Sequence, residues 1–138
     1  MNERIIKMVS EHEDESFFTH VVPSDKAIKD AQDQLGVVLP DQFLEYLRKY
    51  GHGGIGGVEI LGIGLTGNML FLETTLRYRK YGLPENLLVV ENADEWLYCI
   101  DCDTGAVVSW SQADGIRPEF PDFDEFVIRE FNDAIENL

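Results

Sequence analysis

Hydrophobic residues recur at helical spacing in several stretches of the chain, most clearly between Pro40 and Gly51. Phe43, Leu44 and Leu47 fall on one face of this predicted helix, because residues three and four apart lie on the same side. Pro40 suits the first turn, where a backbone N–H has no partner, and Gly51 provides the left-handed residue that commonly ends a helix. Similar patterns predict further helices at 4–9, 24–36, 69–81 and 122–136.

Two of these helices are predicted to form a pair. Ser24 is a favourable N-cap for the earlier helix, and Gly36 is its expected end. The short connector 37–39 then folds the helix that follows Pro40 back onto the first.

Shorter apolar segments, rich in β-branched and aromatic residues, predict strands at 58–61, 87–91, 96–101 and 106–110. Asn92-Ala93-Asp94 and the run 102–105 are turn sequences, so the later strands are expected to form consecutive hairpins in an antiparallel sheet. The chain of 138 residues is short and lacks a long linker, which predicts a single domain. We therefore expect an α+β fold, with helices packed on a mainly antiparallel sheet.

The sequence LGVVLP at 35–40, FLEYLRKYG at 43–51 and the Gly-Gly pair at 53–54 resemble the SUKH superfamily. That superfamily includes fungal cell-wall assembly regulators and many bacterial immunity proteins. The resemblance extends from about Ser24 to residue 138, which leaves 1–23 as an N-terminal extension. It implies a hairpin with an aromatic strand and an acidic turn, and a protein-binding function as an immunity protein or antitoxin. His52 departs from the family pattern, in which a small or amide residue is common.

Acidic residues dominate the chain, whose formal net charge is −15. From Tyr81 onward there are fourteen Asp and Glu residues against Arg117 and Arg129, so −12 of this charge lies in the C-terminal part. Such a field repels nucleic acid and attracts a basic partner protein, although acidic composition also serves solubility alone. No apolar run approaches the length of a membrane span, and the N-terminus lacks the apolar region of a signal peptide. We expect a cytoplasmic protein whose oligomeric state the sequence does not specify.

Several short motifs match catalytic or cofactor-binding patterns without the context that those patterns need. The run 62–67 fits G-x-G-x-x-G but does not open a βαβ series, so tight turns are the better interpretation. The C-x-x-C at 99–102 spans a strand end and not a helix N-terminus, so it predicts two reduced cysteines and no redox site. The Asp-Thr-Gly at 103–105 matches the aspartic-protease tripeptide, but that chemistry needs two carboxylates and the chain has no second copy. His12 lies among carboxylates in a polar loop without convergent spacing for a metal. A basic cluster at 77–80 complements the dipole of its helix. We therefore predict no enzyme, cofactor or metal site.

The leading hypothesis is a binding protein that blocks a basic toxin, such as a nuclease, by stoichiometric contact. Charge reversal at Asp101 and Asp103 is predicted to weaken that binding. Two other functions stay open: a regulatory scaffold, and a small-ligand or enzymatic role at the glycine-rich turn. The candidate partner-binding residues are acidic or are tryptophans that could anchor an interface: Glu91, Asp94, Glu95, Trp96, Asp101, Asp103 and Trp110.

Overall fold

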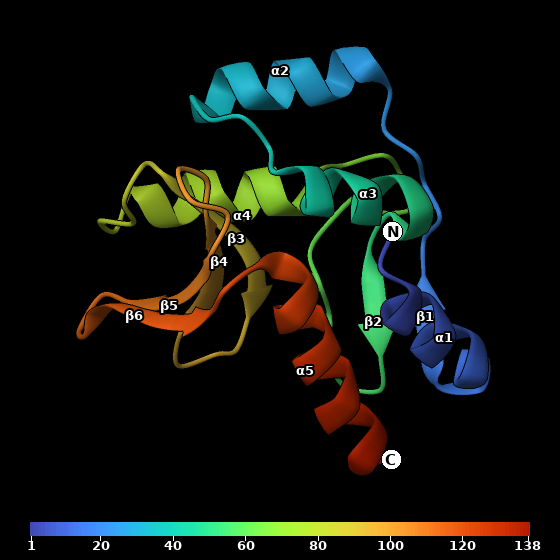
Figure 1. Ribbon diagram of the computed structural model, residues 1–138. Helices are drawn as coiled ribbons and strands as arrows, with labels where there is room; N and C mark the ends of the chain where they lie inside the picture. The colour runs from blue at the N-terminus through green and yellow to red at the C-terminus, as the bar shows by residue number, and fades with distance from the viewer.

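Five α-helices and two antiparallel sheets make up the computed structural model, which describes residues 1–138 (Figure 1). The helices are α1 Glu3–Glu11, α2 Asp25–Leu35, α3 Asp41–Tyr50, α4 Leu70–Arg79 and α5 Phe123–Glu136, with a 3-10 turn at Glu13–Glu15. The strands are β1 Ser16–Phe18, β2 Gly53–Ile55, β3 Leu87–Asn92, β4 Leu97–Asp101, β5 Val107–Ser111 and β6 Gly115–Phe120. The expected α+β fold is confirmed. None of the helices has the length and apolar character needed to cross a bilayer.

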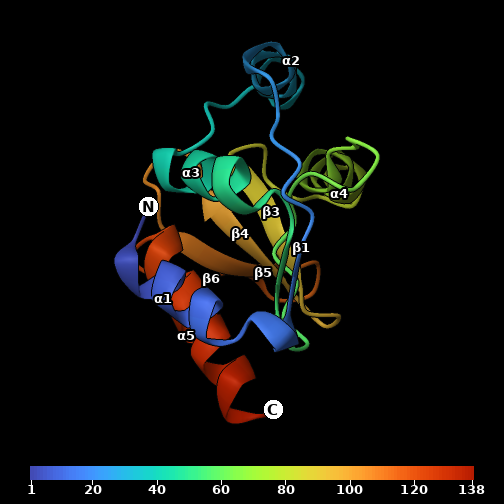
Figure 2. The same cartoon turned by 90° about the vertical axis from the view of Figure 1, so that its right-hand side faces the viewer.

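The larger sheet is a meander in which β3, β4, β5 and β6 pair in chain order. Helix α4 packs on β3, where the Thr75 hydroxyl accepts a hydrogen bond from the Val89 N–H at 3.0 Å. Helix α5 lies on the other face, where the ring of Phe126 stands 5.1 Å from that of Tyr98 in β4. Figure 2 shows α1 alongside α5, on the side of α5 away from the sheet. The sheet is therefore held between two helices.

Aromatic side chains join three of the helices in the core. The ring of Phe43 in α3 makes edge-on contacts with Phe71 of α4, at 5.2 Å, and with Phe123 of α5, at 5.5 Å. Tyr46 is fully buried in the same cluster, and its hydroxyl donates to the Gly53 carbonyl at 2.8 Å. Leu44, expected on the same face, is only half-buried. The predicted inward face of α3 is otherwise confirmed.

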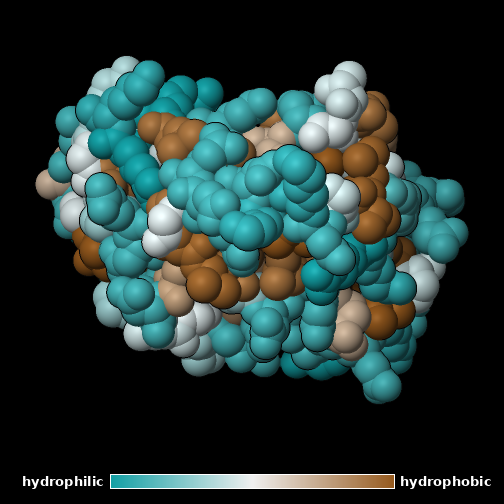
Figure 3. Space-filling model, turned by 90° about the horizontal axis from the view of Figure 1, so that it is seen from above, coloured by the Kyte–Doolittle hydropathy of each residue, from teal (hydrophilic) through white to brown (hydrophobic).

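Helix α2 is tied to the C-terminal end of α4, while its packing on α3 is slight. Arg79 uses one guanidinium nitrogen to donate to the carbonyls of Leu35, at 2.6 Å, and Glu85, at 2.8 Å. Arg79, which belongs to the basic cluster at 77–80, therefore has a structural role, because it donates to a backbone carbonyl that is left without a partner at the end of α2. Viewed from above, the surface over α2 is predominantly hydrophilic (Figure 3).

The structure corrects two predictions about strands. Residues 58–61 form only an isolated bridge, at Ile60, whereas Gly53 and Gly54 belong to β2, which pairs with β1. A Cβ atom on Gly53 would lie 1.9 Å from the Phe17 carbonyl oxygen, so only glycine allows the two strands to approach. Strand β6 was not predicted, because Pro118 interrupts its sequence and its side chains are mostly exposed.

Candidate functional site

The structure distributes the predicted binding residues over three places. Asp94, Glu95 and Trp96 occupy the β3–β4 turn, and Trp110 lies beside them because it pairs with Leu97. Asp101 and Asp103 lie at the other end of β4, about 14 Å away at the rise of an extended strand. Glu91 is on β3, opposite Tyr98, on the face that α5 covers.

The β3–β4 turn fixes Trp96 at the end of the sheet. Asp94 adopts a left-handed backbone conformation with φ 69°, and its N–H donates to the Asn92 side chain at 2.9 Å. The Ala93 N–H then donates to the Trp96 carbonyl at 3.0 Å, which closes the turn. Trp96 is 39 % exposed, whereas Trp110 is 6 % exposed and belongs mainly to the core. Of the two predicted aromatic anchors, only Trp96 presents a large surface to solvent.

A cleft of about 280 Å³ opens beside Trp96 on the sheet face that also carries Tyr98. We call it the polar cleft. Its lining combines aromatic rings with carboxylates and one guanidinium: Glu95, Trp96, Tyr98, Ser109, Trp110, Ser111, Asp114, Gly115, Arg117 and Glu119. The rings of Trp96 and Tyr98 meet edge to face, with centroids 6.1 Å apart.

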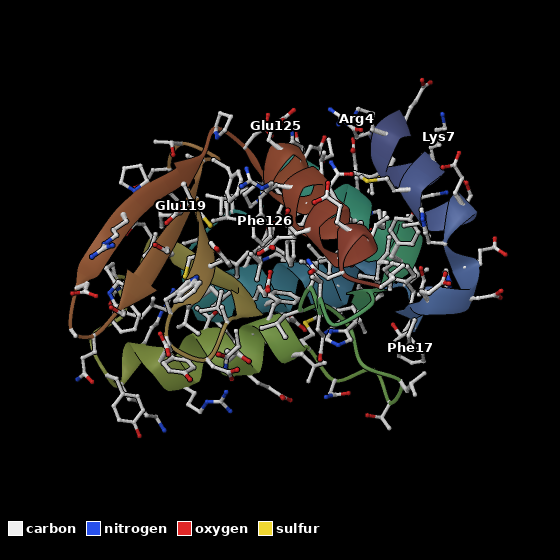
Figure 4. The ribbon with its side chains drawn as sticks, turned by 90° about the horizontal axis from the view of Figure 1, so that it is seen from below. Arg4, Lys7, Phe17, Glu119, Glu125 and Phe126 are labelled. Carbon is white, nitrogen blue, oxygen red and sulfur yellow. The ribbon has the colours of Figure 1, made fainter.

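Glu119 is held in a defined position within the polar cleft. The Ser109 hydroxyl donates to its Oε1 at 2.9 Å. The register of β5 and β6 shifts here, because Val107 pairs with Phe120 while Val108 pairs with Pro118, so Glu119 is the extra residue of a β-bulge. Bulges commonly redirect side chains next to functional sites. Figure 4 shows Glu119 at the sheet and Phe126 on the neighbouring helix α5.

A second cleft, of about 290 Å³, lies on the opposite face of the sheet near the end of α4. We call it the aromatic cleft. Tyr78, near the end of α4, and Tyr81, just after it, line this cleft together with Trp96 and Trp110. Asp94 and Glu95 stand at the rim of the aromatic cleft. The exposed indole of Trp96 and the carboxylate of Glu95 line both clefts. This end of the sheet combines exposed aromatic surface with negative charge, which is suited to a cationic partner.

Sequence reasoning did not identify Tyr78, Tyr81, Tyr98, Ser109 or Glu119 as site residues. Tyr78 and Tyr81 reach the aromatic cleft only through the packing of α4 on the sheet. Glu119 could not be identified as a site residue from the sequence, because the strand that carries it was not predicted. A strand assignment for 115–120 would have been the only usable sequence signal, since it pairs this segment with the strand that bears Ser109.

Asp101 has a structural role in the β4–β5 turn. Its Oδ1 accepts from the Asp103 N–H at 2.9 Å and from the Asn86 side chain at 3.1 Å. The turn ends at Gly105, which has φ 82°, and the Gly105 N–H donates to the Asp101 carbonyl at 2.7 Å. Of this predicted pair, Asp103 is exposed and Asp101 is half-buried.

Glu91 is half-buried against Glu130 of α5, and it does not belong to the exposed acidic surface. Burial raises its pKa well above the ordinary Glu value, and the neighbouring Glu130 carboxyl raises it further. The Oε1 atom of Glu91 is buried without a hydrogen-bond partner, which also favours the protonated carboxyl. Glu91 therefore carries its proton at neutral pH and contributes no negative charge to a partner-binding surface.

Replacing Glu91 with Gln is expected to flatten the dependence of stability on pH. Because the pKa of Glu91 is higher in the folded than in the unfolded chain, stability is lost as pH rises from the ordinary Glu pKa toward the raised one. The loss approaches about 1.4 kcal/mol per pH unit for one proton. Urea unfolding between pH 5 and about pH 9 measures it. Glu95→Gln is the control, and equal slopes for both variants would contradict the prediction.

The side chain of His52 holds the glycine-rich segment in place by contacts at both ring nitrogens. The buried His52 ring accepts from the Gly62 N–H at Nδ1, at 3.0 Å, and its Nε2 lies 2.8 Å from Glu59 Oε1. The following run closes on itself, because the Gly64 N–H donates to the Asn68 carbonyl at 2.8 Å. Both ring nitrogens of His52 have protein partners, and the segment is built as a set of close backbone crossings.

The cysteines and the remaining ionisable groups form no metal-binding arrangement. Cys99 is buried and Cys102 half-buried, both are free thiols, and burial raises the pKa of Cys102 to about 12. No group of three or more His, Cys, Asp and Glu side chains has a geometry that could hold a metal ion.

A family model described as SUKH_5, "SMI1-KNR4 cell-wall", matches residues 2–132. The chain belongs to the SUKH superfamily. The match includes the segment 2–23, which supplies α1 and β1 of this SUKH domain. The fold is also similar to a crystal structure of a protein from Pseudomonas syringae pv. tomato, with a TM-score of 0.63 and 19 % identity. That similarity covers 83 % of this chain and 87 % of the other, and it concerns the fold alone.

Proposed function

We propose that this SUKH domain is a non-enzymatic binding protein that neutralises a basic toxin by stoichiometric contact, as an immunity protein or antitoxin. The observation that carries the proposal is the exposed Trp96 between two clefts whose rims bear Asp94, Glu95, Asp114 and Glu119. Tryptophan is enriched among the residues that dominate binding energy at interfaces. A rim of carboxylates around it selects basic partners and raises the association rate.

The mechanism is occlusion. The acidic surface is drawn to a basic active site, such as one that binds phosphate groups, because both the toxin's substrate and this surface are negatively charged. Trp96 then supplies buried apolar area, which retains the complex after encounter. Catalysis by the SUKH domain plays no part in this scheme.

A regulatory scaffold is the second candidate, and the words "SMI1-KNR4 cell-wall" in the family description favour it. A scaffold would use the same surface to bind a cellular protein without inhibiting a toxic activity. The two functions differ in what the partner does when the SUKH domain is absent.

The test compares captured partners and their effects on growth. Tagged wild-type protein and the Trp96→Ala variant are exposed to lysate of the source organism at low and high salt, and bound proteins are identified by mass spectrometry. We expect a basic protein that the wild type retains at low salt and the variant loses. Expressed alone, this partner should arrest growth, and co-expression of the wild type should restore it. A partner without toxicity would overturn the immunity function and leave the scaffold.

A further inference from the structure

We propose that the polar cleft binds the guanidinium group of one arginine side chain from the partner. This proposal rests on the proposed protein-binding function and names what the partner must present. The cleft, at about 280 Å³, is slightly smaller than typical ligand pockets, which begin at roughly 300 Å³, so it suits a single inserted side chain.

Carboxylates and rings surround the position that the guanidinium would take. Glu119 uses Oε1 to accept from Ser109, which orients the carboxylate and leaves Oε2 without an intramolecular partner. Glu95 and Asp114 line the same cleft. A planar guanidinium forms directed hydrogen bonds with a carboxylate and stacks on an aromatic face, whereas an ammonium provides only a compact charge. The walls of Trp96 and Tyr98 therefore favour arginine over lysine.

The β-bulge adds Phe120 to the face that Arg117 and Glu119 share. Ser109 pairs with Arg117 across the two strands, and in a regular strand Glu119 would be the next residue on the same face. The bulge adds one residue, so that Arg117, Glu119 and Phe120 can all be directed toward the face that carries Tyr98. Phe120 packs against Tyr98, with centroids 6.4 Å apart, and Glu119 reaches Ser109.

Arg117 is the one basic residue of the cleft. Its guanidinium lies 3.8 Å from Asp114 and its side chain is 68 % exposed, so it is held loosely. Three carboxylates against this one guanidinium leave an excess of two negative charges in the lining. An incoming arginine would compete with Arg117 for Asp114. Removing the charge of Arg117 is therefore expected to strengthen binding.

Intrinsic fluorescence offers a direct measurement, because the chain contains two tryptophans and both line the polar cleft. The probes are N-acetyl-arginine amide and its neutral isostere N-acetyl-citrulline amide, with N-acetyl-lysine amide as a charge-matched comparison. We expect a saturable change for the arginine probe, with a dissociation constant on the order of 1 mM. The citrulline probe should bind at least about tenfold more weakly, and the lysine probe about threefold more weakly.

Three variants assign the signal to the cleft. Glu119→Gln should weaken the arginine probe about fivefold or more, and Arg117→Gln should strengthen it about twofold or more. Glu125→Gln, an exposed carboxylate outside the cleft, should leave the affinity unchanged. Circular dichroism confirms that each variant is folded.

Binding that is absent, equal for arginine and citrulline, or equal for arginine and lysine would overturn the guanidinium assignment. So would an unchanged affinity in Glu119→Gln. None of these results decides the proposed function, which fails separately if the captured partner does not arrest growth when it is expressed alone.

Discussion

Replacing Gly62 with alanine is expected to destabilise the domain by about 3 kcal/mol or more. A Cβ atom at this position would lie 1.7 Å from the carbonyl oxygen of Gly51 and 3.2 Å from the Cα of His52. Both contacts are with backbone, so no side-chain rotation relieves them. The Gly62 N–H also donates to His52, and the Ile63 N–H donates to the Gly51 carbonyl at 3.0 Å. Moving the chain apart would break these bonds.

Gly57→Ala is the matched control in the same glycine-rich segment. Nothing lies within 4 Å of a Cβ atom at Gly57, and its φ is outside the left-handed region. Its substitution should change stability by less than about 1 kcal/mol, and any change should favour the folded state because alanine restricts the unfolded chain. Urea unfolding of the purified variants at a fixed pH measures both effects. Similar stabilities for the two variants would show that the crossing of residues 51 and 62 is not tight in solution.

The glycine-rich segment also shows how far local sequence determines this fold. Its composition predicted turns, and the left-handed φ of 58° at Gly56 agrees with that prediction. Gly54 and Gly62 are required for a different reason, because each lies against the backbone of another residue, while Gly53 combines such a contact with a φ of 136°. No pattern of spacing distinguishes a glycine needed for its φ from one needed for lack of a side chain.

The helices were predicted because their signals are local. The Ser24 hydroxyl accepts from the Ala27 N–H at 3.1 Å, and Asp122 accepts from the Glu125 N–H at 2.9 Å, as capping residues do. Gly36 ends α2 with φ 71°. In each case the cap and the apolar stripe lie within one stretch of sequence, so no tertiary information is required.

The candidate site was predicted only in part, because it depends on contacts between distant segments. The acidic residues of the C-terminal part look alike in sequence, but Glu91 is enclosed by α5, Asp101 organises a turn, and Glu95 stands at the rim of both clefts. Trp96 and Trp110 likewise differ in exposure because one lies in a turn and the other within β5. Strand pairing and helix packing determine the roles of these residues, and the amino-acid composition alone does not reveal either.

Trp96→Ala is expected to weaken binding of the protein partner by about 2 kcal/mol, or roughly 30-fold, mainly through faster dissociation. The indole is the largest exposed aromatic surface shared by the two clefts, and its loss leaves the neighbouring carboxylates without an apolar anchor. Because the side chain is 39 % exposed, the same substitution should cost the fold much less than a core truncation. Surface plasmon resonance with the captured partner separates the two rates.

Asp103→Lys provides the comparison at the opposite end of the sheet. Charge reversal there alters the long-range field without touching either cleft, so we expect a slower association that depends on salt and an almost unchanged dissociation rate. Asp101 is unsuitable for this purpose, because its carboxylate holds the turn through Asp103 and Asn86. If Asp103→Lys accelerates dissociation while Trp96→Ala does not, the interface lies at the β4–β5 turn and the two clefts are not the binding surface.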